Sequence, residues 1–244
     1  MKTKFTTAIA AVSVLAAMTA VQASAAAFTD TKDHWAQATI EKWQDKGIIS
    51  GYPDGTFKPD NPITRAELAK VLTKAFDLEK NENKLTENPY SDIDTNAWYW
   101  SYVQCAEMYM PIYKLPVSHP TNLPYAENEE QNKNGFLPDV NALRMHVAES
   151  LVELKKERDK VNVSVPEINA LKESLNKTFK DADYEELFAM HGSVPVNVRR
   201  MFEYTWLANE LGIMQGNADG FFLPYNNVTR AELITMIDRV SDSE

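Results

Sequence analysis

Two short stretches combine residue types that could bind an anion. The phrase Thr-Arg-Ala-Glu occurs at residues 64–67 and again at 229–232, and each arginine lies fourteen positions after a glycine, Gly51 or Gly216. A threonine followed three residues later by glutamate predicts a capping box at a helix start. The arginine has no role in such a cap, and the positive end of the helix dipole disfavours a cation there. Its repetition predicts a further role.

Two interpretations of this arginine stay open from spacing alone. Arg65 and Arg230 could hold an anionic ligand together with free N–H groups of the helix start, because a guanidinium makes charge-assisted bonds to carboxylates. Alternatively, each could form an internal salt bridge to a neighbouring segment, with Asp30, Asp92 or Asp181 as its partner. Both interpretations require a fold that brings distant segments together.

The elements that position these residues recur three times along the chain. Each recurrence starts with an aromatic-x-Asp pattern, at residues 28–30, 90–92 and 179–181. Each later places a phenylalanine eight positions before an arginine: Phe57 and Arg65, Phe136 and Arg144, Phe222 and Arg230. Internal repetition on this scale predicts an array of similar modules.

Each module is predicted to contain two helices joined by a turn. In the first, Ala36, Thr39, Ile40 and Trp43 have the spacing of an amphipathic helix, and Gly47 is expected to end that helix. Residues 52–55 predict a tight turn. A second helix follows, with its buried face at positions 68, 71, 72, 75 and 76, as at 233, 236, 237 and 240 of the third module.

The first and third modules resemble the S-layer homology family. The resemblance of the first rests on Phe28-Thr29-Asp30, Trp35, the stretch 47–59 and residues 63–67. That of the third rests on residues 179–181, 212–216, 219–224 and 229–232. It implies a mainly α fold in which three tandem helical modules form a pseudo-threefold spindle. The corresponding divisions are 28–86, 90–155 (degenerate), a helical connector 156–178, and 179–244.

The resemblance also implies a function, which is non-covalent anchoring to the cell envelope. Members of the family bind secondary cell-wall polysaccharide, often with pyruvylated sugars, or a peptidoglycan-linked polymer, in grooves between modules. By that similarity Arg65 and Arg230 would bind the ketal carboxylate. The grooves would also be lined by Thr64, Thr229, Gly51, Gly216 and Trp35, with Arg144 at the equivalent position of the second module. Burial tendencies alone would instead place Trp35 in the core.

The second module departs from the pattern, so its groove is expected to be weak or lost. Residues 109–113 replace the glycine-rich stretch, Leu143 replaces the capping threonine and His146 replaces the glutamate. A polar tract is added at 116–134. The third module has Arg200 where the first has Trp35, and an extra segment at 184–198. In the connector, residues 164–167 predict another capping box.

The N-terminus has the pattern of a secretory signal peptide over residues 1–27. Two lysines precede an apolar run at 8–21, which ends in small residues and is shorter than the ~20 residues of a membrane-spanning helix. We therefore expect an exported protein of the cell wall or cell surface, with no transmembrane segment in the mature chain. We also expect no separate effector domain of the kind that most family members carry.

Charge and residue chemistry exclude several other classes. The net charge of −10 disfavours nucleic-acid binding. The lone Cys105 and four scattered histidines predict neither a disulfide nor a metal site, and no cofactor motif occurs. With no distinguishable catalytic set, we expect a protein that is not an enzyme. Assembly with surface-layer proteins is the main alternative to glycan binding, and a cell-wall hydrolase is a more distant one.

Overall fold

The computed structural model describes residues 27–81, 84–110, 135–181 and 196–241. Nearly all of the predicted signal peptide, the polar tract 116–134 and most of segment 184–198 lie outside these ranges. The described chain is helical, and its extended pairing is limited to three isolated bridges. The α-helices are α1 (Gln37–Asp45), α2 (Arg65–Ala75), α3 (Trp100–Ala106), α4 (Arg144–Asp159), α5 (Ile168–Thr178), α7 (Val196–Glu210) and α8 (Arg230–Ser241), with 3-10 turns η1 (Leu78–Lys80) and η2 (Glu107–Tyr109). The predicted mainly α class is confirmed.

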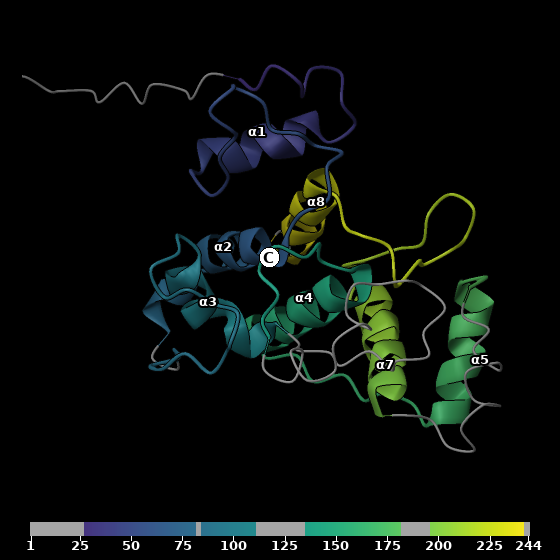
Figure 1. Ribbon diagram of the computed structural model, residues 1–244. Coiled ribbons are helices and arrows are strands. Elements are labelled where there is room, and N and C mark those ends of the chain that lie inside the picture. Colours follow the sequence, from purple (N-terminus) through teal and green to yellow (C-terminus); the bar gives the residue numbers. More distant parts are fainter. Residues whose placement is uncertain (1–26, 82–83, 111–134, 182–195, 242–244) are drawn as a thin grey trace, which may run out of the picture.

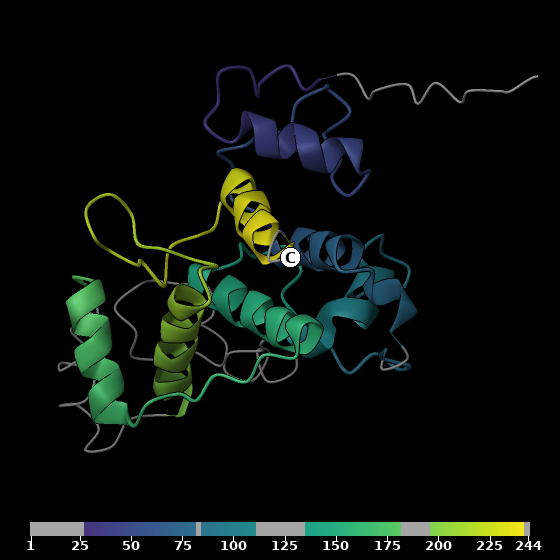
Figure 2. The same ribbon diagram turned by 180° about the vertical axis from the view of Figure 1, so that it is seen from behind.

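Helices of different modules pack against one another around a common centre. The first helix of each module packs on the second helix of the module before it in a cyclic order: α1 on α8, α3 on α2, and α7 on α4. Figures 1 and 2 show α2, α4 and α8 meeting near the middle, with α1, α3 and α7 outside them. The connector helix α5 lies against α7.

A ring of backbone hydrogen bonds joins the three modules just before their second helices. The Ile63 N–H donates to the Val228 carbonyl (2.9 Å), Val228 donates to Ala142 (2.9 Å), and Ala142 donates to Ile63 (2.8 Å). This cyclic pattern is the geometric basis of a pseudo-threefold arrangement. The spindle outline of the whole chain stays a prediction.

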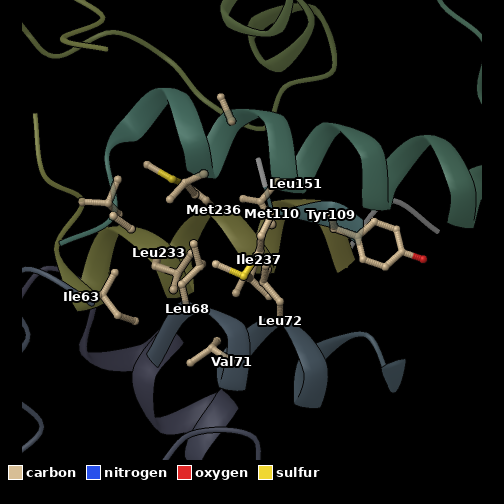
Figure 3. Packing of buried hydrophobic residues seen from close by; sticks show 14 of the residues in the cluster. Ile63, Leu68, Val71, Leu72, Tyr109, Met110, Leu151, Leu233, Met236 and Ile237 are labelled. Atoms are coloured by element: carbon tan, nitrogen blue, oxygen red, sulfur yellow. The ribbon is translucent and has the colours of Figure 1, made fainter. Parts of the chain in front are cut away.

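The second helices bury their apolar faces against one another. Leu68 and Leu72 of α2, Leu151 of α4, and Leu233 and Ile237 of α8 are all buried in one cluster. Figure 3 shows these side chains pointing into the space between the three helices. The buried faces predicted for α2 and α8 are confirmed, with Ala75 and Phe76 only partly buried.

The predicted helix ends are largely observed. Thr64 and Glu67 form a complete capping box, and Thr229 makes the same reciprocal hydrogen bonds with Glu232. Leu143 at the start of α4 provides no side-chain cap. Gly47, just beyond α1, has a φ of +69°, a left-handed conformation that glycine adopts readily.

The capping box predicted at 164–167 is wrong. Helix α5 begins at Ile168, with Glu167 before it and no side-chain hydrogen bond to the cap. A start after Ser164 would require helical geometry at Val165, which Pro166 disfavours in the residue preceding it. The helix therefore starts later.

The three repeated aspartates support backbone turns. The Asp30 carboxylate accepts the N–H groups of Phe57 and Lys58 at 2.7 Å each. Asp92 and Asp181 do the same for residues 136–137 and 222–223. The second residue of each pair has a φ of 57° to 59°. The aspartate of each aromatic-x-Asp pattern thus holds a left-handed residue directly after the phenylalanine whose carbonyl the pattern positions.

Candidate functional site

The motif arginines cross from one module to the next. Arg230 donates from Nε to the Phe57 carbonyl (2.8 Å), from Nη1 to Glu67 Oε1 (3.1 Å) and from Nη2 to the Ser50 carbonyl (3.3 Å). Arg230 is buried, with 8% of its surface exposed. The internal salt-bridge interpretation is therefore realised, but its partner is the capping-box glutamate and not an aspartate.

Arg144 repeats this geometry between the second and third modules. Its Nε, Nη1 and Nη2 donate to the Phe222 carbonyl (2.8 Å), Glu232 Oε1 (3.5 Å) and the Gln215 carbonyl (3.2 Å). Burial lowers the pKa of Arg144, and the Glu232 charge opposes that shift. The guanidinium stays charged because its ordinary pKa is so high.

Arg65 has a different neighbour. Its Nε donates to the Phe136 carbonyl at 2.8 Å, and its guanidinium lies 4.9 Å from the centroid of the Phe136 ring. The position of the glutamate is taken by His146, which is buried. Burial lowers the pKa of His146 well below its ordinary value, and the Arg65 charge adds to this effect. Arg65 thus faces a neutral imidazole.

An open cavity lies beside Arg230, and we call it site A. It has a volume of about 530 Å³. The first module supplies Gly51, Tyr52, Glu67 and Lys70, the second supplies Trp98, and the third supplies Arg230 and Ile234. The Tyr52 hydroxyl donates to Glu67 at 3.0 Å. Burial raises the Tyr52 pKa, which Arg230 counteracts and Glu67 reinforces.

A second cavity, site B, lies beside Arg144 and has a volume of about 270 Å³. It is built in the same cyclic manner from all three modules. The third module contributes Gly216, Asn217, Glu232 and Arg239, the second contributes Arg144, and the first contributes Trp35. Both sites therefore combine a glycine turn, a motif arginine and a tryptophan from three different modules.

The structure divides the predicted site residues between these places. Gly51 and Arg230 meet in site A, whereas Gly216, Arg144 and Trp35 meet in site B. Arg65 lies in the third, degenerate seam. The hydroxyls of Thr64 and Thr229 accept the N–H groups of Glu67 and Glu232, at 3.2 Å each, and so serve the helix caps.

Packing requires glycine at position 51 and leaves little room for a side chain at position 216. A Cβ on Gly51 would lie 2.4 Å from Phe28 Cε1 and 2.5 Å from the Thr56 carbonyl oxygen. A Cβ on Gly216 would lie 3.1 Å from the Phe179 ring and from the Phe221 carbonyl oxygen. The aromatic residue that opens each module therefore occupies the space a side chain would need.

The tryptophans beside the two sites are exposed. Trp35 is 64% exposed and Trp98 is 56% exposed. The expectation from burial tendencies is wrong for Trp35, because Ala36 occupies the buried position at this helix start. Trp98 was not among the candidate site residues. Its position in the second module, corresponding to Trp35 in the first, was the sequence signal that could have identified it.

The third seam, between α4 and α7, is closed by an ion pair. Arg200, which the sequence equates with Trp35, donates from Nε to Glu149 Oε1 at 2.8 Å. Glu149 is buried and corresponds to Lys70 in its distance from the motif arginine. Burial raises the pKa of Glu149, opposed by the hydrogen bond from Arg200.

Sites A and B are suited to binding an acidic sugar. Each has an exposed indole face, which can pack against the apolar face of a sugar ring. Each also has a cation besides the ion-paired arginine, namely Lys70 in site A and Arg239 in site B. In the described ranges, no helix is long and apolar enough to span a membrane.

Comparison with known proteins matches the S-layer homology domain to residues 27–69 and 207–234. The chain is similar to an amylopullulanase of Thermoanaerobacterium thermosulfurigenes (26% identity, 86% of this chain, 9% of that protein). It is similar to S-layer protein EA1 of Bacillus anthracis (32%, 58% of this chain, 14% of that protein). It also resembles a cellulosome-anchoring protein of Acetivibrio thermocellus (37% identity, 32% of this chain, 17% of that protein).

This chain spans only 9% to 17% of the length of these three relatives. The two regions matched to the family supply the capping boxes at 64–67 and 229–232, the glycine turn of site A and Arg230. In these two regions the chain is similar to proteins that carry S-layer homology domains.

Proposed function

We propose that this chain anchors protein to the cell envelope by binding an acidic cell-wall polysaccharide in sites A and B. The observation that carries the proposal is their common composition. Each is an open cavity that joins a glycine turn, a motif arginine and an exposed tryptophan from three modules. An anchoring role requires retention on a repetitive polymer, and two sites on one chain provide it through effective concentration.

The preferred ligand is a polymer with carboxylate groups, such as pyruvyl ketals. The chain carries a net charge of −10, so an anionic ligand must be attracted by local cations. Arg230 and Arg144 have internal partners, so in our proposal the exposed tryptophan is a main contact of each site, and Lys70 adds a cation in site A. A charge-assisted hydrogen bond contributes about 1.5–3 kcal/mol, so one site alone binds weakly.

The relatives support a cell-surface location and a binding role. One is named a cellulosome-anchoring protein and another an S-layer protein. The amylopullulanase shows that such sequence also occurs in enzymes, where this chain covers a small share of the whole. In our proposal the chain holds the polymer and does not cleave it.

Sedimentation with purified cell-wall sacculi tests the proposal. We expect the protein to pellet with intact sacculi and to stay in the supernatant after the secondary polymer or its pyruvate is removed. Release of soluble sugar from the sacculi during incubation would instead indicate an enzyme. Equal sedimentation with intact and stripped sacculi would contradict glycan anchoring.

Protein assembly in a surface layer is the second candidate. It is favoured by the internal ion pairs Arg230–Glu67 and Arg144–Glu232, which stabilise the seams without any ligand. Concentration-dependent self-association, measured by sedimentation velocity without sacculi, would support this alternative. The assembly hypothesis also predicts that neither Trp98→Ala nor Trp35→Ala changes sedimentation with sacculi.

A further inference from the structure

Paired cations and aromatic rings continue beyond site A along the seam between α2 and α3. Lys70 Nζ lies 5.9 Å from the centroid of the Trp98 ring, and Lys74 Nζ lies 5.7 Å from that of Tyr102. The centroids of the two rings are 6.4 Å apart. Residues four apart on a helix share one face, so both lysines point toward this seam. We call these four residues the α2–α3 track.

The track is accessible along its length. Trp98 is largely exposed, while Lys70 and Tyr102 are half-buried. The Lys74 side chain is 34% exposed and forms an ion pair with Glu79 at 2.5 Å. That glutamate is itself half-exposed, and such surface pairs are weak, so an anionic ligand can replace it.

The other two seams differ at the corresponding positions. On α4 these positions hold Glu149 and Glu153, which bind Arg200 and Tyr204. The two lysines are thus replaced by two acids. On α8 they hold Thr235 and Arg239, and the position corresponding to Tyr102 in the first module is Thr39.

We propose that the α2–α3 track binds the next sugar units of an acidic polysaccharide whose first unit occupies site A. The first acidic group lies against Lys70 with its sugar on Trp98, and a following acidic group lies against Lys74 with its sugar on Tyr102. The two lysines are four residues apart on the helix, about 6 Å along its axis. This inference rests on the proposed function and makes site A a site for an oligosaccharide, whereas site B holds a single unit.

Calorimetric titration with two probes tests the track. One probe is a methyl glycoside bearing one pyruvyl ketal, and the other is a linear trisaccharide of the same unit. We expect the trisaccharide to bind about fivefold more tightly than three independent units would, an advantage that falls with added salt because exposed charges are screened. Lys74→Gln removes this advantage and leaves the affinity for the monosaccharide unchanged.

Two further variants separate a ligand contact from a general charge effect. Lys177→Gln on α5 removes a cation that is ion-paired with Glu173 in a similar way, and it should not change binding. Glu79→Gln releases Lys74 from its partner and should raise trisaccharide affinity about twofold. A purely structural role for Lys74 would not produce that gain.

The outcomes distinguish the track from the proposed function. Suppose that the glycoside binds but the trisaccharide binds no more tightly than independent units, or that Lys177→Gln weakens trisaccharide binding as much as Lys74→Gln does. Either result would contradict the proposed role of the track and leave the proposal for site A intact. If neither probe nor intact sacculi bind, the proposed function fails, and the track fails with it.

Discussion

Across the α2–α3 seam, Trp98 stands exposed above Lys70, whereas across the α4–α7 seam Arg200 donates to the buried carboxylate of Glu149. The helices of both seams pack in the same cyclic order, and both begin from the same backbone ring. Two of the side chains that differ between these seams are Trp98 against Arg200 and Lys70 against Glu149, and Arg200 and Glu149 form an internal ion pair. The comparison teaches that the repeated backbone contacts maintain the fold, while residues outside the shared motif decide whether a seam carries an exposed indole or an internal ion pair.

The largest expected effect concerns a feature that the open and closed seams share, the buried motif arginine. Arg230→Ala should lower the free energy of unfolding by about 2–3 kcal/mol, because it leaves Glu67 and the carbonyls of Phe57 and Ser50 without this donor. Urea denaturation measures the loss.

Arg199→Ala is the matched control, since Arg199 is exposed and pairs with Glu203 one turn along the same helix, so its removal should leave the free energy of unfolding nearly unchanged. Full stability of the Arg230→Ala protein combined with lost sacculus binding would show that this arginine serves the ligand and not the fold.

Breaking the ion pair of the closed seam should have the next largest effect. Arg200→Met leaves the Glu149 carboxylate, 2% exposed, without its cation, and should cost about 2 kcal/mol of stability at neutral pH. Adding Glu149→Leu should restore most of that loss. A double-mutant cycle by urea denaturation measures the coupling, and simple additivity of the two changes would contradict an energetic link.

Removing the exposed indole of the open seam should change binding and not folding. Trp98→Ala is expected to weaken binding of a pyruvylated glycoside by about 1 kcal/mol, roughly fivefold, with stability changed by less than about 0.5 kcal/mol. Met108→Ala removes another exposed apolar side chain and should leave binding unchanged. An equal loss of glycoside affinity in both variants would show that Trp98 does not contact the ligand in site A.

The smallest expected effect is on the pH dependence of stability, and it tests the difference between His146 and the glutamates at the same position in the other modules. Its folded pKa lies below the ordinary histidine value of about 6.5, so its contribution to stability is present above that pH and is lost as pH falls. His146→Gln should therefore reduce the decline of unfolding free energy below pH 6.5. An unchanged pH profile would show that the imidazole is not kept neutral against Arg65.

Much of the local structure followed from sequence patterns. The capping boxes at Thr64 and Thr229, the left-handed Gly47 and the buried faces of α2 and α8 depend on neighbours a few residues away, and such effects are legible in sequence. The later start of α5 shows the limit, because Pro166 competes with the cap motif.

The composition of the sites was not predictable in this way. The sequence grouped Gly51, Thr64 and Arg65 because they are close together in one motif, but the fold sends Gly51 to Arg230 and Arg65 to the seam with His146. The packing of helices from different modules depends on long-range contacts. No local sequence pattern determines the order of the modules around the axis.

The sequence by itself determined the repeated modules, their helix caps and the conserved spacing of phenylalanine and arginine within this chain, since these rest on short-range hydrogen bonding and periodicity. Only the tertiary structure decided that Arg230 and Arg144 pair with glutamates of the next module, and that Trp35 and Trp98 stay exposed beside open cavities. The reason is physical: a buried charge takes whichever partner packing brings within reach, and that partner can lie 163 residues away, as Glu67 does from Arg230.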